Sequence, residues 1–346
     1  MDISSSWEKS IERSFFREDF RRAKVDEIGH LSLPVYDVEL YQEGVLSVID
    51  RGALRGRGFR IVIDYAYGSS SIIFPQILGR LGCEVIALNA YLDPGRITKS
   101  AEGFHRSLQQ LSEIVRSLGA DLGIMLDTGA EKIFVVDDNG DLLSDDLALA
   151  LMALLVMRTH PPAVIGVPIT ASSAIEDLAR DQGFRVIRTK TAPRASTEAA
   201  TQEGVIFVGD GLGGFIFSQF QPVFDGMLAT LKLLEMLAAQ DLRLHQLIRS
   251  IPQRFRCREQ IPCPLERKGG TMRALIADTA DERVELVDGV KVHLGNDSVI
   301  LYPDQDRPYF HIIAEAGTLA RAEIHLARYR EVLARCMKGS LPEVTP

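Results

Sequence analysis

The chain has 346 residues, of which 46% are hydrophobic, and a formal net charge of −8 at pH 7. This length predicts two or three folded domains, and the apolar content is enough to give each of them a core. Acidic and basic residues are interspersed, which argues against nucleic acid or an anionic membrane as the main partner. The cysteines lack metal-ligand spacing and are expected to be reduced thiols of a cytoplasmic protein; they are Cys83, Cys257, Cys263 and Cys336.

Residues 1–35 are predicted to form a connector. The spacing of Trp7, Ile11 and Phe15, with charged residues between them, predicts a helix with one apolar stripe, and Pro34 is expected to break the segment. This stretch has little of its own to pack against, so we expect its partner to lie elsewhere. No apolar run approaches the roughly 20 residues that span a bilayer, and the N-terminus lacks the apolar core of a secretory signal.

Residues 36–143 and 144–252 are predicted to be two α/β domains in tandem. After a helix from Tyr36 to Asp50 and a Gly-rich joint from Arg51 to Gly58, apolar strand patterns alternate with capped helical patterns. The same order begins again after Ser144. Alternating strands and helices favour three-layer α/β/α domains with mixed sheets.

Residues 253–346 are predicted to be an α+β domain. Short alternating patterns, among them Arg273 to Thr279, predict antiparallel strands, and a single closing helix is expected from Thr318 to Lys338. The prolines between Ile251 and Pro264 suggest a linker before this domain.

Several stretches together resemble one enzyme family. They read RIVIDYAYGSSS, DLGIMLDTGAEKIFVVDDNGDLL, GVIFVGDGLGGFIF and ILYPDQDRPYFHIIAEA, and they follow one another over roughly residues 36–338. In order and spacing they are similar to domains 2 to 4 of the α-D-phosphohexomutases, the phosphomannomutases and phosphoglucomutases. The resemblance implies two α/β/α domains followed by a domain like the TATA-binding protein. It also implies phosphoryl transfer between sugar oxygens through a phosphoserine and Mg²⁺.

The first loop to compare binds Mg²⁺ in that family and reads D-G-D-x-D-R. Here Asp127 keeps the first acid, Gly129 replaces the second, Glu131 replaces the third, and Lys132 replaces the arginine. Mg²⁺ prefers octahedral oxygen ligands at short distances, so Asp127 and Glu131 are expected to hold it weakly. The alternative is a solvated β-turn with no metal.

The second loop recognises the sugar in the family and reads G-E-x-S-G-H. Here Asp210 shortens the acid, Gly211 follows it, and Leu212 replaces the serine hydroxyl. A site without its hydrogen-bonding partners loses about 1–3 kcal/mol for each buried polar group left unpaired. Because a strand follows this loop, its glycines are expected to serve a tight turn with positive φ rather than to cradle a phosphate.

The third loop binds phosphate in the family and reads R-P-S-G-T-E-P. Here Asp304 and Asp306 bring carboxylates to the place of the phosphate, while Arg307 stands at the family's glutamate. Each carboxylate would repel a phosphate by about 1 kcal/mol at ~4 Å even in water. The candidate anion-binding residues are Lys132, Arg188, Lys190, Arg194 and Arg307.

No phosphoserine context of the family's form, T-A-S-H-N-P, precedes residue 36. The segment IERSFFREDFRRAKVDEIG resembles the C-terminal region of fused mannose-1-phosphate guanylyltransferase-like proteins. The leading hypothesis is therefore a non-catalytic module of mannose metabolism that binds a sugar phosphate, a nucleotide sugar or a nucleotidyltransferase subunit. The alternatives are an active mutase part whose phosphoserine domain comes from another chain, and a purely structural module.

Overall fold

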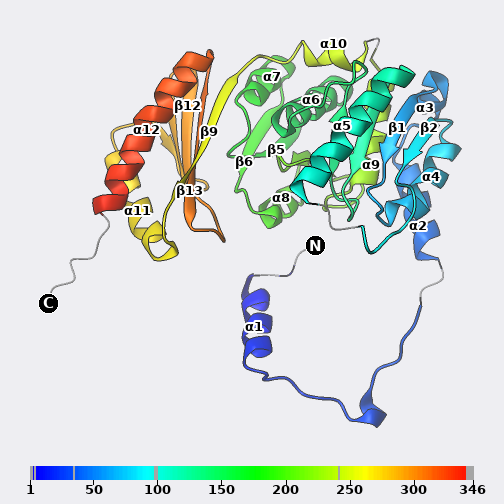
Figure 1. The fold of residues 1–346 in the computed structure, drawn as a ribbon, viewed down its shortest axis with the longest axis horizontal. Coiled ribbons are helices and arrows are strands. Elements are labelled where there is room, and N and C mark those ends of the chain that lie inside the picture. The colour runs from blue at the N-terminus through cyan, green and yellow to red at the C-terminus, as the bar shows by residue number, and fades with distance from the viewer. Residues whose placement is uncertain (1–2, 4, 34–35, 97–99, 241, 340–346) are drawn as a thin grey trace.

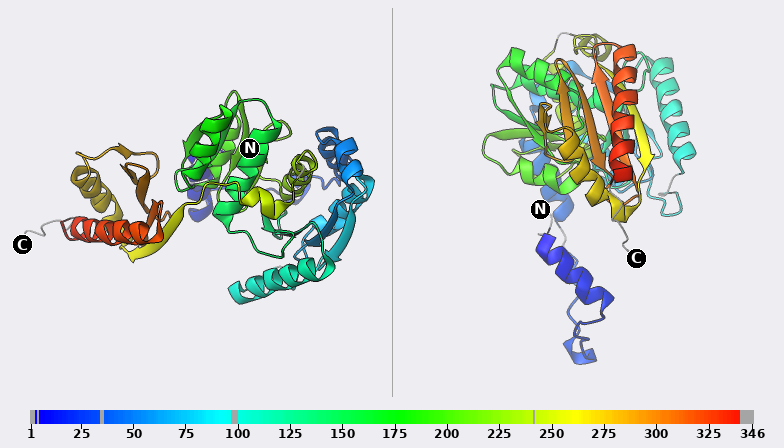
Figure 2. Two further views of the ribbon diagram at one scale, coloured as in Figure 1. Left: turned by 90° about the horizontal axis from the view of Figure 1, so that it is seen from above. Right: turned by 90° about the vertical axis from the view of Figure 1, so that its left-hand side faces the viewer.

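The computed structural model describes residue 3 and residues 5–33, 36–96, 100–240 and 242–339. The predicted break at Pro34 lies outside them. Figure 1 shows three sheets arranged in a row, with the helix nearest the N-terminus standing apart from them. Seen from above, in Figure 2, the row follows an arc that ends with the C-terminal sheet.

The first sheet combines three parallel strands with one antiparallel strand, in the order β2-β1-β3-β4. Its central strands are buried along most of their length, which explains their continuous apolar sequence. Helix α5 packs on one face of the sheet and α4 on the other. The elements are β1 (Arg60–Asp64), α4 (Ser70–Arg80), β2 (Glu84–Leu88), α5 (Ala101–Leu118), β3 (Leu122–Leu126) and β4 (Ile133–Val136).

The second sheet repeats this arrangement, in the order β6-β5-β7-β8. Its last strand is again antiparallel to its neighbour. The predicted tandem of two α/β units with mixed sheets is therefore confirmed. The elements are β5 (Val164–Pro168), α7 (Ala174–Gln182), β6 (Arg185–Thr189), α8 (Pro193–Ala200), β7 (Val205–Gly209) and β8 (Phe215–Phe217).

Helices α6 (Asp145–Thr159) and α9 (Gly226–Ala238) join the two units into one core. Residues 148–157 of α6 are all buried, as expected for a helix that is apolar on every side. Both helices contact each other and strands of both sheets. Asp225 is the N-cap of α9, because its side chain accepts a hydrogen bond from the N–H of Leu228 at 2.8 Å. Helices α2 (Asp37–Ser47), α3 (Arg51–Arg57) and α10 (Leu244–Ile248) complete these units.

The C-terminal domain is a five-stranded antiparallel sheet with two helices, α11 and α12, on one face. Part of the other face meets the second α/β unit, where Ile169 packs against Ile300 and Ile313. The elements are β9 (Phe255–Pro262), α11 (Leu265–Asp278), β10 (Val284–Glu285), β11 (Val290–Leu294), β12 (Asp297–Pro303), β13 (Tyr309–Ala316) and α12 (Leu319–Gly339).

Three local predictions are wrong. The joint from Arg51 to Gly58 is helix α3, because Asp50 caps its first N–H groups and Gly58 ends it in the left-handed conformation. The segment from Arg273 to Thr279 belongs to helix α11 rather than to a strand, so the domain has two helices instead of one. The linker between Ile251 and Pro264 contains β9, an edge strand, and edge positions tolerate its proline.

The predicted connector helix is α1 (Ser5–Phe16). Its apolar stripe faces solvent, with Trp7 66% and Phe15 68% exposed. A short 3₁₀ turn, Val25–Glu27, follows. In the part of the chain that the structure describes, no helix has the length and apolar character needed to cross a membrane.

Candidate functional site

Two of the three loops singled out in the sequence meet at the junction of the first two sheets. The loop after Asp127 connects β3 to β4, and the loop after Asp210 connects β7 to β8. Lys132 and Gly214 form an isolated antiparallel bridge, and the N–H of Ile133 donates to the carbonyl of Gly213 at 2.9 Å. Because the two hairpins occupy the same place in two similar units, their ends lie side by side.

The Asp127 loop is folded around its own carboxylate. Asp127 Oδ1 accepts hydrogen bonds from the N–H groups of Glu131 at 2.8 Å and Lys132 at 3.0 Å. Only Asp127 Oδ2 and the exposed Glu131 are left for a cation, and the described residues contain no group of three or more His, Cys, Asp or Glu that could hold a metal ion. This donor set does not fit Mg²⁺, which needs more oxygens at short, near-octahedral positions.

The Asp210 loop is closed in the same way. Asp210 Oδ1 accepts from the N–H groups of Leu212 at 2.7 Å and Gly214 at 2.8 Å. Its Oδ2 lies 3.1 Å from Lys132 Nζ, and the Asp210 side chain is only 8% exposed. The predicted positive φ is confirmed at Gly211 and Gly213. Asp210 and Lys132 therefore satisfy each other, and the carboxylate has little left to offer a sugar hydroxyl.

The loop between β12 and β13 also binds its own aspartate. Asp304 Oδ1 accepts from the N–H groups of Asp306 at 3.0 Å and Arg307 at 2.8 Å, and Oδ2 lies 2.9 Å from His311 Nε2. Burial acts to raise the pKa of Asp304, but the hydrogen bonds from His311, Arg307 and Asp306 outweigh it and lower that pKa to about 2. The N–H groups that could bind a phosphate thus already hold a carboxylate.

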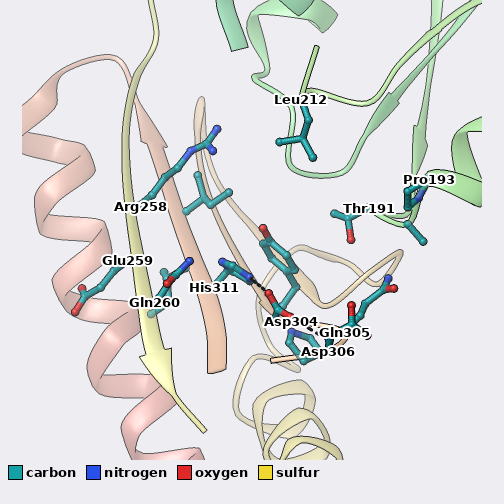
Figure 3. A pocket seen from close by; sticks show the side chains of 15 residues that line it. Thr191, Pro193, Leu212, Arg258, Glu259, Gln260, Asp304, Gln305, Asp306 and His311 are labelled. Atoms are coloured by element: carbon teal, nitrogen blue, oxygen red, sulfur yellow. Dashed lines mark hydrogen bonds and ion pairs between the residues drawn. The ribbon is translucent and has the colours of Figure 1, made fainter. Parts of the chain in front are cut away.

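The Asp304 loop and Leu212 face each other across a cleft of about 860 Å³ (Figure 3). The second α/β unit supplies Thr191, Pro193 and Leu212 to one side, and β9 supplies Arg258 and Gln260 to the other. Figure 3 shows His311 reaching toward Asp304 within this cleft. Carboxylates outnumber guanidinium groups along its wall, so the cleft does not favour a phosphate.

The predicted anion-binding residues do not form one site. Arg188 has a side chain only 9% exposed and binds Glu176 and the carbonyls of Pro168 and Ala171, so it holds the fold together. Arg194 forms an ion pair with Glu198 at 2.7 Å.

The other two candidates lie at the surface. Lys190 is exposed beside Thr191, and Arg307 donates to the Tyr309 hydroxyl at 3.2 Å. Neither joins Lys132, which is occupied by Asp210.

Sequence reasoning missed Arg258 and His311 in the cleft wall. The signal for Arg258 is the alternation of Arg256, Arg258 and Gln260, which places all three on one face of an extended strand. Treating the prolines as a linker hid that alternation. His311 needed the register of β13, in which it lies opposite Tyr302 on β12, and the two rings stack with centroids 4.7 Å apart.

Restoring carboxylates should restore metal binding. A Cβ at Gly129 would meet nothing closer than Glu131 Cγ at 3.7 Å, and it would point toward Asp127 Oδ2 at 3.9 Å. We expect Gly129→Asp combined with Glu131→Asp to bind Mn²⁺ at least tenfold more tightly than the natural chain, because it gathers three short carboxylates. Electron paramagnetic resonance of free Mn²⁺ measures this. Gly129→Asn with Glu131→Gln is the uncharged control, and equal Mn²⁺ affinity for the two double variants would contradict the expectation.

The fold and the three loops define a tandem α/β protein with a C-terminal antiparallel domain. Residues 39–140 match the family model described as "Phosphoglucomutase/phosphomannomutase, alpha/beta/alpha domain II", and residues 144–255 match domain III of the same family. A protein of Methanothermobacter thermautotrophicus named "Probable phosphoglucosamine mutase" is 31% identical over 96% of this chain and 73% of its own length. The chain therefore belongs to the phosphoglucomutase/phosphomannomutase family, the α-D-phosphohexomutases.

A further relative and two solved structures are similar to this chain. A "Phosphoglucomutase/phosphomannomutase" of Thermococcus kodakarensis is 28% identical over 98% of this chain and 74% of its own length. The crystal structure of a family protein from Burkholderia thailandensis superimposes with a TM-score of 0.80 at 21% identity, covering 99% of this chain and 72% of that one. A solved N-acetylphosphoglucosamine mutase of Aspergillus fumigatus, in complex with GlcNAc-6P and magnesium, shares the fold with a TM-score of 0.60 at 12% identity over 86% of this chain and 69% of that one.

Proposed function

We propose that this chain is a non-catalytic phosphohexomutase-like module of sugar-phosphate and nucleotide-sugar metabolism. The observation that carries the proposal is shared by all three loops. Asp127, Asp210 and Asp304 each use one carboxylate oxygen to accept two N–H groups of their own loop. Loops that would present polar groups to Mg²⁺, sugar and phosphate are instead satisfied internally.

Opening such a loop for a ligand has a cost. A hydrogen bond to a charged group contributes about 1.5–3 kcal/mol, and each loop would lose two of them. The Asp210 loop would also lose the ion pair with Lys132, whose partner carboxylate is nearly buried. A weakly bound substrate does not supply that free energy, so the loops favour their closed form over a ligand-bound form.

The biological setting is the finer part of the proposal. The resemblance of Ile11 to Gly29 to fused mannose-1-phosphate guanylyltransferase-like proteins supports a module that works with a nucleotidyltransferase domain or subunit in the cytoplasm. Its ligand would be a sugar phosphate or a nucleotide sugar. We retain the likeness of the C-terminal domain to the TATA-binding protein as a prediction.

An activity assay tests the non-catalytic role. The chain is mixed with mannose 1-phosphate or glucosamine 1-phosphate, Mg²⁺ and a hexose bisphosphate, with and without a separately purified phosphoserine domain from an active relative. Phosphorus NMR is expected to show no 6-phosphate in any mixture. The same domain added to the matching fragment of the active relative is the positive control. Turnover that needs the added domain would instead establish the alternative, an active part whose phosphoserine comes from another chain.

A further inference from the structure

We propose that an arginine-lined pocket beside the hinge of the C-terminal domain binds a phosphomonoester. The pocket has a volume of about 740 Å³ and is distinct from the cleft of Figure 3, with which it shares only Arg258. It lies where the segment between α10 and β9 crosses from the second α/β unit to the C-terminal domain (Figure 1). This pocket would be the place where the proposed module binds its phosphate-bearing ligand, and in that respect the inference rests on the proposed function.

Positive charge dominates the wall of this pocket. Among the described residues, its arginines are Arg249, Arg254, Arg256 and Arg258, and Asp146 is its one acid. Asp146 is shared, since it pairs with Arg258 at 2.5 Å and also with Arg256.

Carboxylates outside the wall complete the pairing. Arg254 pairs with Asp177, and Arg256 lies 3.3 Å from Glu315. Within the described part of the chain, Arg249 is exposed and its guanidinium makes no hydrogen bond or ion pair. One guanidinium at the mouth of the pocket is thus left for an anion.

One of the buried arginines also has a donor without an acceptor. Nε of Arg254 is buried and has no hydrogen-bond acceptor among the described residues, whereas Nε and Nη1 of Arg256 face Glu315 and Asp146. Buried N–H groups are normally paired, and an unpaired one is unfavourable. A phosphate carries several acceptor oxygens and suits the planar guanidinium, so a small reorientation of the Arg254 side chain would satisfy its Nε–H.

The apolar part of the pocket lining selects for an organic phosphate. The volume of the pocket falls in the range of small-molecule sites, which combine a mainly apolar lining with a few polar groups. The apolar lining residues are Leu147, Ala150, Ala174, Ile248, Ile251 and Pro252. A phosphomonoester with an apolar or planar organic group fits this combination of arginines and apolar residues better than inorganic phosphate does.

Calorimetric titration at fixed ionic strength tests the proposal, with phenyl phosphate and inorganic phosphate as probes. We expect phenyl phosphate to bind at least tenfold more tightly than inorganic phosphate. Arg249→Ala should weaken phenyl phosphate at least tenfold, and Arg249→Lys should recover part of the loss. Because Arg249 is exposed and unpaired, both variants should fold, which circular dichroism checks. Arg307→Ala, in the Asp304 loop and outside this pocket, is the matched control and should bind like the natural chain.

Unchanged binding in folded Arg249→Ala would overturn the site, and so would loss of binding in Arg307→Ala. Equal affinity for phenyl phosphate and inorganic phosphate would overturn the inference that the apolar lining residues bind the organic group. These results are separable from the proposed function. Mutase turnover would contradict the non-catalytic role but would not contradict phosphate binding that depends on Arg249. Failure of phenyl phosphate to bind would overturn the pocket but would not contradict the closed form of the three loops.

Discussion

Replacing Gly213 by alanine is expected to destabilise the protein by about 2–4 kcal/mol. Gly213 has a φ of +90°, and a Cβ there would lie 2.8 Å from the backbone carbonyl oxygen of Ile133. The N–H of the same residue, Ile133, donates a hydrogen bond to the carbonyl of Gly213. Relief of the clash would therefore separate the two hairpins. Thermal and urea unfolding of the purified variant measure the loss.

Gly129→Ala in the neighbouring hairpin is the matched control. A Cβ at that position has only ordinary contacts, the nearest at 3.7 Å. Its free energy of unfolding should stay within about 0.5 kcal/mol of the natural chain. If Gly213→Ala were as stable as Gly129→Ala, the contact between the Asp127 and Asp210 loops would not exist in solution.

Replacing Lys291 by methionine is expected to stabilise the protein, in the opposite direction to most core substitutions. Lys291 is 5% exposed, and no hydrogen bond or ion pair to its ammonium group is found among the described residues. Burial, followed by the nearby charge of Arg188, lowers its pKa to about 8, while Glu176, Glu285 and Glu315 act to raise it. A buried lysine charge is costly, and the gain at pH 7 should be on the order of 2–3 kcal/mol.

The gain should depend on pH. The folded-state pKa of Lys291 is about 8, below the ~10.4 of an unfolded lysine, so between these values the unfolded state binds more protons. The contribution of Lys291 to the stability of the natural chain therefore rises from pH 8 to pH 10, and the advantage of Lys291→Met shrinks. Urea unfolding of both proteins at pH 7 and pH 9.5 tests this, with Lys190→Met as an exposed control. An advantage that grows with pH would contradict the assignment.

Sequence patterns were sufficient to predict the architecture wherever the apolar pattern of one helix or strand indicated its burial. The apolar runs of β1, β5 and residues 147–157 of α6 are typical of buried elements, and the structure buries nearly all of these residues. The patterns failed where local signals conflicted. Glycines at 52 and 56 hid α3, whose stability comes from the Asp50 cap and from packing of Leu54 against the shared core.

The site was harder to predict, because its chemistry depends on contacts across long sequence separations. Substitutions in the three loops were visible as departures from the family pattern. That Lys132 pairs with Asp210 follows only from the placement of two hairpins 78 positions apart in the numbering. The burial of Arg188 against Glu176 likewise depends on how α7 packs on β6, which no single segment reveals.

The closed state of the three loops can be measured directly. In a ¹H–¹⁵N correlation spectrum, the amides of Glu131, Leu212 and Arg307 report on the Asp127, Asp210 and Asp304 loops, since each donates to its own aspartate. On addition of Mg²⁺ and mannose 1-phosphate, these three amides should keep their chemical shifts and remain protected from hydrogen exchange. Saturable shifts of all three, with loss of protection, would show that the loops open for a substrate and would contradict the non-catalytic account.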